Sequence, residues 1–97
     1  MRDRGGAVRI EVQPTPNVHA LKFTLDRRVT QGRSETYTSL EQAAGSPVAQ
    51  RLLRIPGVRM VFLLNDFVTV TRQPDARWED IVPEVERALR ECLEPRE

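Results

Sequence analysis

The sequence predicts an α+β fold, a two-layer sandwich in which a mostly antiparallel sheet carries two helices on one face. Three observations predict this fold. Residues 58–64 and 67–72 form two apolar runs separated by two residues, as in a β-hairpin. Residues 47–55 and 77–93 repeat apolar side chains at helical spacing. Residues 8–13 alternate apolar and polar side chains, as a half-buried strand does.

The first part of the chain predicts two strands joined by a turn. Residues 8–13 form the first strand, with Val8, Ile10 and Val12 directed inward. Residues 14–17, with the sequence PTPN, then break the strand, because proline removes a donor and asparagine favours turns. A second alternation places one set of side chains inward, Leu21, Phe23 and Leu25, and another outward, Ala20, Lys22 and Thr24.

Two weaker strand signals follow in the connection to the first helix. We expect a short strand around residues 28–30 and a third strand at residues 36–39, with Tyr37 directed inward. The helix itself begins at Ser46 and Pro47, because serine caps orphan N–H groups and proline is well suited to the first helical position. Pro56 and Gly57 end it.

The hairpin has a predicted register. Asn65 and Asp66 can both adopt the positive φ of a type I′ turn. That turn places four pairs opposite each other: Leu64 and Phe67, Leu63 and Val68, Phe62 and Thr69, and Val61 and Val70. Both faces of the hairpin are partly apolar, which indicates central strands.

The last predicted element is a helix over residues 77–93. One stripe of its surface is apolar and should pack on the core: Trp78, Ile81, Val82, Val85, Leu89 and Cys92. We expect Cys92 to pack there as a small buried hydrophobe. Pro83 should kink this helix or loosen its first turn.

Length and composition predict a single domain over residues 7–97, preceded by a flexible N-terminus at residues 1–6. The net charge of +1 provides no global attraction to nucleic acid or membrane. The charged and glycine-rich start does not resemble a secretory signal, so we expect a cytoplasmic protein.

The sequence contains few residues able to carry chemistry. Cys92 and His19 are its one cysteine and one histidine, so the chain can form neither an internal disulfide nor, by itself, a zinc or iron–sulfur site. No glycine-rich phosphate loop is present, and a capping role explains Ser46. We therefore expect no catalytic residue, no metal ligand and no cofactor bound by this chain alone.

The expected functional feature is a surface. The helices should leave one sheet face uncovered, where an apolar patch of Met60, Phe62 and Phe67 lies beside polar strands. The turn before the second strand and that strand itself add three polar candidates, Asn17, His19 and Lys22. These six residues are the predicted partner-binding site.

Several segments together resemble a known family, the N-terminal domain of Nfu-type iron–sulfur cluster proteins. The similar segments are TPN at residues 15–17, ALKF at 20–23, SPVA at 46–49, DFVTVT at 66–71 and the W-x-x-I-x-P-x-V pattern from 78 to 85. One departure is Val18 and His19, which replace a second Pro-Asn of that family.

The resemblance implies an accessory or docking module linked to iron–sulfur cluster assembly or delivery. The family holds its cluster on a CxxC motif in a separate domain, which these residues lack, and Cys92 does not correspond to that motif. The implied partner is a cluster carrier or assembly protein, and a cluster would be met only through that partner. A weak homodimer stays open as an alternative, and no membrane partner is expected.

Two other functions remain open from the sequence. An arginine-rich composition, 14 Arg against one Lys, also suits a small nucleic-acid-binding domain, although the near-neutral charge argues against it. A small enzyme would have its cleft near Asn17, His19 and Lys22, and no reaction is suggested by these residues.

Overall fold

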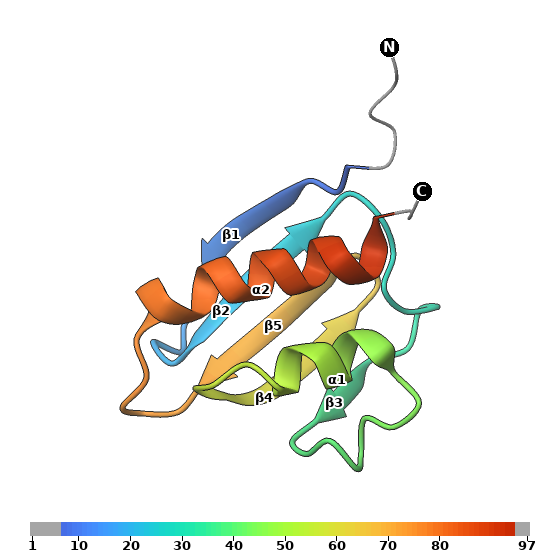
Figure 1. Cartoon of the computed structure of the whole chain (residues 1–97). Helices are drawn as coiled ribbons and strands as arrows, with labels where there is room; N and C mark the ends of the chain where they lie inside the picture. Colours follow the sequence, from blue (N-terminus) through green and yellow to red (C-terminus); the bar gives the residue numbers. More distant parts are fainter. Residues whose placement is uncertain (1–6, 95–97) are drawn as a thin grey trace.

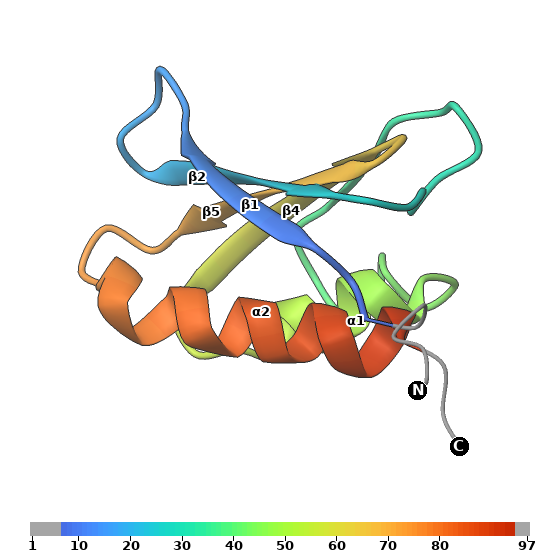
Figure 2. The same ribbon diagram turned by 90° about the horizontal axis from the view of Figure 1, so that it is seen from above.

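The computed structural model describes residues 7–94 and shows two layers, a five-stranded sheet with both helices on one of its faces (Figure 1; Figure 2). The predicted α+β two-layer class is confirmed. The expected flexible segment, residues 1–6, lies outside the described residues. The elements in chain order are β1 (Ile10–Pro14), β2 (Ala20–Leu25), β3 (Glu35–Tyr37), α1 (Pro47–Leu53), β4 (Val58–Leu64), β5 (Phe67–Arg72) and α2 (Trp78–Leu93).

The sheet has the order β1-β2-β5-β4-β3, and every neighbouring pair is antiparallel. The β4–β5 hairpin therefore lies inside the sheet, with β2 beside β5 and the short β3 beside β4. On the helix side the strands bury their inward residues, among them Phe23, Leu63 and Val68, against Leu52 of α1 and Leu89 of α2. Figure 2 shows the opposite sheet face without a covering helix.

The hairpin register is confirmed at all four predicted pairs, from Leu64 opposite Phe67 to Val61 opposite Val70. The predicted turn type is wrong. A type I′ turn needs positive φ at both central residues, and here Asn65 has φ 52° while Asp66 is not in that region. Neighbouring chain holds the turn instead, because the Asn65 carbonyl accepts from the N–H groups of Val29 and Thr30 at 2.6 and 3.3 Å.

That contact also explains why residues 28–30 form no strand. Their N–H groups bond to a turn rather than to a strand ladder, and the Thr30 hydroxyl accepts from the Asn65 N–H at 2.8 Å. Thr30 is consequently buried. The third strand exists as predicted but covers Glu35–Tyr37 rather than residues 36–39. Tyr37 is half-buried on the helix side, and its hydroxyl donates to Glu35 at 3.0 Å.

The first strand starts two residues later and ends one residue later than predicted, since β1 begins at Ile10 and continues through Pro14. Pro14 is tolerated there because β1 is an edge strand, where a missing N–H breaks no central ladder. The position of β1 at the edge of the sheet also explains how its apolar side chains become more exposed along the strand. Val8, just before β1, is buried, Ile10 is half-buried and Val12 is 37% exposed. Val12 points toward the helix side as predicted, because it is directly opposite Phe23, but it is not fully buried.

Helix α1 begins where its cap predicts. Ser46 is in the extended region, its side chain accepts from the Ala49 N–H at 3.3 Å, and Pro47 occupies the first helical position. The helix ends at Leu53, and Gly57 then adopts φ +95° to start β4. A helix of seven residues is too short to persist alone, so its cap and its buried residues hold it.

We expect Ser46→Ala to lower the free energy of unfolding by about 1 kcal/mol, because the Ala49 N–H loses its acceptor. Urea unfolding followed by circular dichroism measures the change. Ser34→Ala is the matched control, since Ser34 is exposed and accepts no bond found in the structure. An equal effect in the two variants would contradict the capping role.

Helix α2 confirms the predicted stripe over most of its length and corrects it at the end. Ile81, Val85 and Leu89 are buried, and the helix runs without interruption through Pro83. Cys92, predicted to be buried, is exposed. At the last turn Leu93 rather than Cys92 packs against the core, so Cys92 lies beside the buried stripe.

The two ends of the described chain meet at this corner. The Arg27 guanidinium donates to the carbonyls of both Ala7 and Leu93, at 3.0 and 2.9 Å. The Val8 N–H donates to the Glu94 carboxylate at 2.9 Å. Side chains of the β2–β3 connection and of α2 therefore fasten the beginning of β1 to the end of the helix layer.

Candidate functional site

The uncovered side of the sheet is the candidate site. Strand alternation and pairing place one row of residues across it from Thr24 through Phe67 to Leu64, and a second from Lys22 through Thr69 to Phe62. We call this surface the open face and define it by these residues: Lys22, Thr24, Met60, Phe62, Leu64, Phe67, Thr69 and Thr71. All of them are half-buried, none by a helix.

A cation and two aromatic rings lie together on the open face. The Phe62 and Phe67 rings have centroids 6.0 Å apart and are tilted by 41°. The Lys22 Nζ lies 4.4 Å from the centroid of Phe67, within the range of a cation–π interaction. Met60 adjoins this cluster through β4, opposite Thr71. The predicted patch of Met60, Phe62 and Phe67 thus lies on one surface, with Lys22 over it.

The open face offers little to a nucleic acid. RNA-binding sheets combine exposed aromatic platforms with a basic stripe. Here the two rings pack against each other, and among the described residues that define the open face Lys22 is the one basic side chain. The defining residues of the open face therefore lack the basic stripe of RNA-binding sheets.

Asn17 belongs to the turn before β2, away from this cluster, and its side chain is engaged there. Its Oδ1 accepts from the His19 N–H at 2.9 Å, and its carbonyl accepts from the Ala20 N–H at 3.0 Å. The Thr15 hydroxyl donates to the carbonyls of Asn17 and Ala20. The PTPN segment is therefore a turn closed by its own side chains.

His19 lies apart from Lys22. The Arg72 N–H donates to the His19 carbonyl at 2.8 Å, so strand pairing extends to this residue. Three positions along a strand reverse the direction of a side chain, so His19 is on the helix side and Lys22 is on the open face. The expected cleft of Asn17, His19 and Lys22 would thus need side chains from both sides of the sheet.

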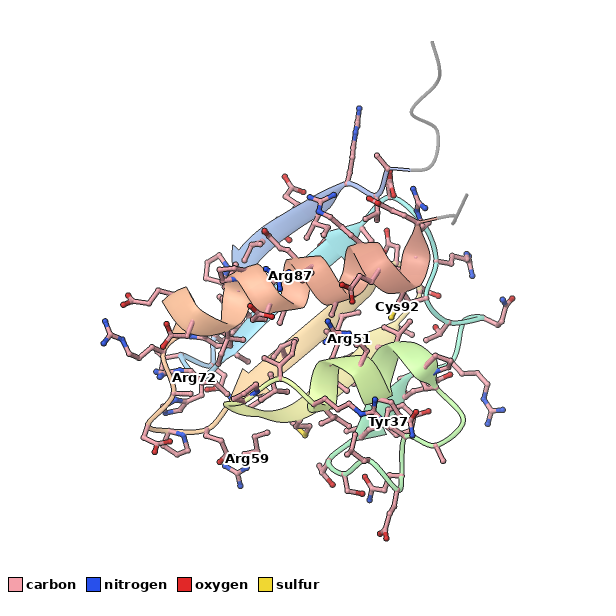
Figure 3. All side chains as sticks on the ribbon, in the orientation of Figure 1. Tyr37, Arg51, Arg59, Arg72, Arg87 and Cys92 are labelled. Atoms are coloured by element: carbon pink, nitrogen blue, oxygen red, sulfur yellow. The ribbon has the colours of Figure 1, made fainter. Side chains whose placement is uncertain are left out.

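A group of polar contacts lies around Arg72, which Figure 3 labels, near the start of α2. The Arg72 guanidinium donates to the Ala76 carbonyl and lies 5.7 Å from the Trp78 ring centroid. The Trp78 Nε1 donates to the Val18 carbonyl at 3.4 Å. His19 Nδ1 and Arg72 Nε are buried without a hydrogen-bond partner in the described part of the chain. These contacts attach the turn before β2 to the start of α2.

The described residues contain no metal-binding cluster. Between residues 7 and 94, no three side chains of His, Cys, Asp or Glu come together. Burial raises the pKa of the Cys92 thiol, and Glu91 adds to this while Arg51 opposes it. At neutral pH this thiol is therefore protonated, which disfavours it as a ligand or nucleophile.

One surface hollow of the described residues contains neither the histidine nor the cysteine. This hollow, of about 530 Å³, lies beside the start of β1 and is lined in part by Glu11, Asp26 and Arg90. A hydrogen bond from Arg27 at 3.0 Å lowers the pKa of the Asp26 carboxyl. Asp26 is therefore an ionised surface group rather than a proton donor at neutral pH.

Sequence reasoning placed the individual residues but missed their contacts. Lys22 was expected on the outer side of β2, yet its position over Phe67 depends on the pairing of β2 with β5. These strands are separated by more than forty positions along the chain, and no local signal gives their register. The pairing of β5 with β2 and β4 also places Leu64, Thr69 and Thr71 on the open face.

Comparison with known proteins finds a family. Residues 10–96 match the model described as the N-terminal region of the scaffold protein Nfu/NifU. The chain is 42% identical over 77 residues to the NFU1 iron-sulfur cluster scaffold homolog, mitochondrial, of Drosophila ananassae, covering 78% of this chain and 27% of that protein. It is 38% identical over 80 residues to NifU-like protein 4, mitochondrial, of Arabidopsis thaliana, covering 82% and 28%.

The chain therefore spans about a quarter of the length of these curated relatives. Solved structures agree with the fold. A NifU-like protein from Saccharomyces cerevisiae superposes with a TM-score of 0.75 at 26% identity, over 94% of this chain and 82% of the other. The Staphylococcus aureus protein SAV1430 gives 0.71 at 32% identity, over 82% and 96%. Neither helix of the described residues is both long and apolar enough to cross a bilayer.

Proposed function

The chain belongs to the family of Nfu/NifU scaffold N-terminal domains, and from this membership we propose that it is a protein-interaction module of iron–sulfur cluster assembly or delivery. The module has no enzymatic activity and meets the cluster through a partner that carries or assembles it. Its binding surface is the open face. The residues proposed to contact the partner are Lys22, Met60, Phe62 and Phe67, while Asn17 and His19 shape the neighbouring turn.

The donor set of this chain does not fit an iron–sulfur cluster. Such a cluster is held by about four thiolates. The sequence has one cysteine, and the pKa of its thiol is raised. No step of the proposed function therefore passes through a cluster held by these residues.

The observation that carries the proposal is a sheet face left without a second layer. Domains of two layers bury the apolar side of each sheet, and an apolar surface left outside usually has a partner. Here two phenylalanines and a methionine remain on the side away from both helices (Figure 2). A sheet surface of this kind binds another protein through side-chain packing.

The proposed function requires this protein to be in the same cellular compartment as its partner. A cytoplasmic location is part of this proposal. The printed names of the fly and plant relatives place those proteins in mitochondria, so related domains also occur in proteins of that organelle.

The proposed function is tested with a tagged chain isolated from the cells that produce it. We expect the captured proteins to include an iron–sulfur protein, and the double variant Phe62→Ser, Phe67→Ser to reduce its recovery by at least about tenfold, since central apolar residues dominate such interfaces. Mass spectrometry identifies the captured protein, and iron and sulfide analysis measures its cluster.

Leu40→Ser is the matched control, because Leu40 is an exposed apolar residue outside the open face. Melting curves establish that each variant is folded. Two results would refute the proposed function: stoichiometric iron and sulfide on the purified chain alone, or undiminished recovery of the iron–sulfur protein by the double variant.

A further inference from the structure

We propose that the open face recognises a protein segment that presents an Asp or Glu carboxylate among apolar side chains, with that carboxylate paired to Lys22. This inference rests on the proposed function and specifies the chemistry of the partner. It is carried by the position and the unpaired state of one ammonium group.

Lys22 lacks an anionic partner within the described structure. No carboxylate of residues 7–94 lies within ion-pair distance of its Nζ. Glu11, the acid that pairing places on the same side of the sheet, is on β1 opposite Thr24 and not opposite Lys22. The ammonium group instead lies over the Phe67 ring. The ammonium group therefore has a ring contact but no ion pair among the described residues.

A partner that covers the phenylalanines must also cover this ammonium. Because its Nζ lies 4.4 Å from the Phe67 centroid, the ammonium in its observed position would be enclosed by any partner that covers this ring. Burial of an unpaired charge is costly, and a paired one is tolerated when its partner is well placed. The interface therefore needs an anion at Lys22, surrounded by groups that pack on Phe62 and Met60.

The same charge disfavours a second copy of the chain. Two open faces packed together would bring two Lys22 ammonium groups into one dry interface, and like charges there oppose association. A phosphate group could also pair with Lys22, but the surrounding rings and methionine match apolar side chains rather than a hydrated sugar-phosphate backbone. An acidic and apolar protein segment satisfies both the charge and the apolar surface.

The test uses three synthetic peptides that are identical in their apolar residues and carry Glu, Gln or Lys at the central position. Each is titrated into the ¹⁵N-labelled full chain, and amide shifts give both the affinity and the location. We expect the Glu peptide to bind about tenfold more tightly than the Gln peptide, and the Lys peptide most weakly. The shifts should concentrate on β2, β4 and β5.

Substitution of Lys22 identifies the contact. Lys22→Gln should abolish the preference for Glu over Gln, and Lys22→Glu should reverse it in favour of the Lys peptide. Arg87→Gln is the control, because Arg87 is an exposed cation on α2 on the opposite side of the molecule (Figure 3). This control variant should retain the preference of the original chain. Thermal melting checks that all variants fold.

Several outcomes would overturn the inference. These are equal binding of the three peptides, no binding by any of them, a Glu preference that survives Lys22→Gln, or tighter binding of a short RNA oligonucleotide at the same amides. A stable dimer through the open face, detected by sedimentation, would also overturn it.

The inference and the proposed function fail separately. If the Glu peptide binds through Lys22 but the extract contains no captured iron–sulfur protein, the proposed function fails alone. If Lys22→Gln captures that protein as well as the original chain does, the inference fails alone.

Discussion

Phe23→Ala is expected to lower the free energy of unfolding by about 3–5 kcal/mol, which is a large part of the stability of a domain of this size. Phe23 is 0% exposed and lies in β2, between Val12 of β1 and Val68 of β5. Its removal loses the burial of a ring and leaves a cavity that the sheet cannot close, because strands on both sides fix the backbone. Urea unfolding at constant pH measures the loss.

Val12→Ala is the matched control for this change. Val12 is directly opposite Phe23 and on the same side of the sheet, but it is 37% exposed on the edge strand. We expect a cost of about 1 kcal/mol or less for this variant. If both variants shifted the urea midpoint equally, the core would not be centred on β2 as the structure shows.

Gly57→Ala is expected to cost about 2–4 kcal/mol, since it combines backbone strain with steric crowding. Gly57 has φ +95°, a conformation that side chains disfavour. A Cβ built there would lie 2.9 Å from the Ala76 Cβ and 3.2 Å from the Ile81 Cδ1. Both neighbours are short or buried, so the loop before α2 or the helix itself would have to move.

Two other glycines separate the two causes. Gly32 has φ +92° with nothing within 4 Å of a built Cβ, so Gly32→Ala should show strain alone, about 1–2 kcal/mol. Gly45 has an open surrounding and no left-handed φ, so Gly45→Ala should change stability by less than about 0.5 kcal/mol. Calorimetry on the three variants compares them. A cost for Gly57→Ala no greater than that for Gly32→Ala would show that the contact with Ala76 is unimportant.

Local signals in the sequence predicted what local interactions determine. The hairpin register followed from a two-residue connection and the alternation of β4 and β5, and the start of α1 followed from Ser46 and Pro47. Each of these features is formed by residues adjacent in the chain. Their positions were therefore correct to within a residue.

Features set by distant parts of the chain were missed. The turn at Asn65 depends on donors from Val29 and Thr30, and the exposure of Cys92 depends on which side of the last turn of α2 packs on the core. The same limit applies to the candidate site. Met60, Phe62 and Phe67 could be assigned to one surface from the hairpin, but the contact of Lys22 with Phe67 required the order of strands in the sheet.

The bonds of a single guanidinium to the first and nearly the last of the described residues make this domain easy to transplant. Because Arg27 holds the carbonyls of Ala7 and Leu93, residues 7–94 enter and leave the fold at one spot. A unit with adjoining ends can be grafted into a surface loop of an unrelated host without stretching that host, or circularly permuted with a short linker. The junction lies at the end of α2, so such a graft would keep the opposite side of the sheet accessible.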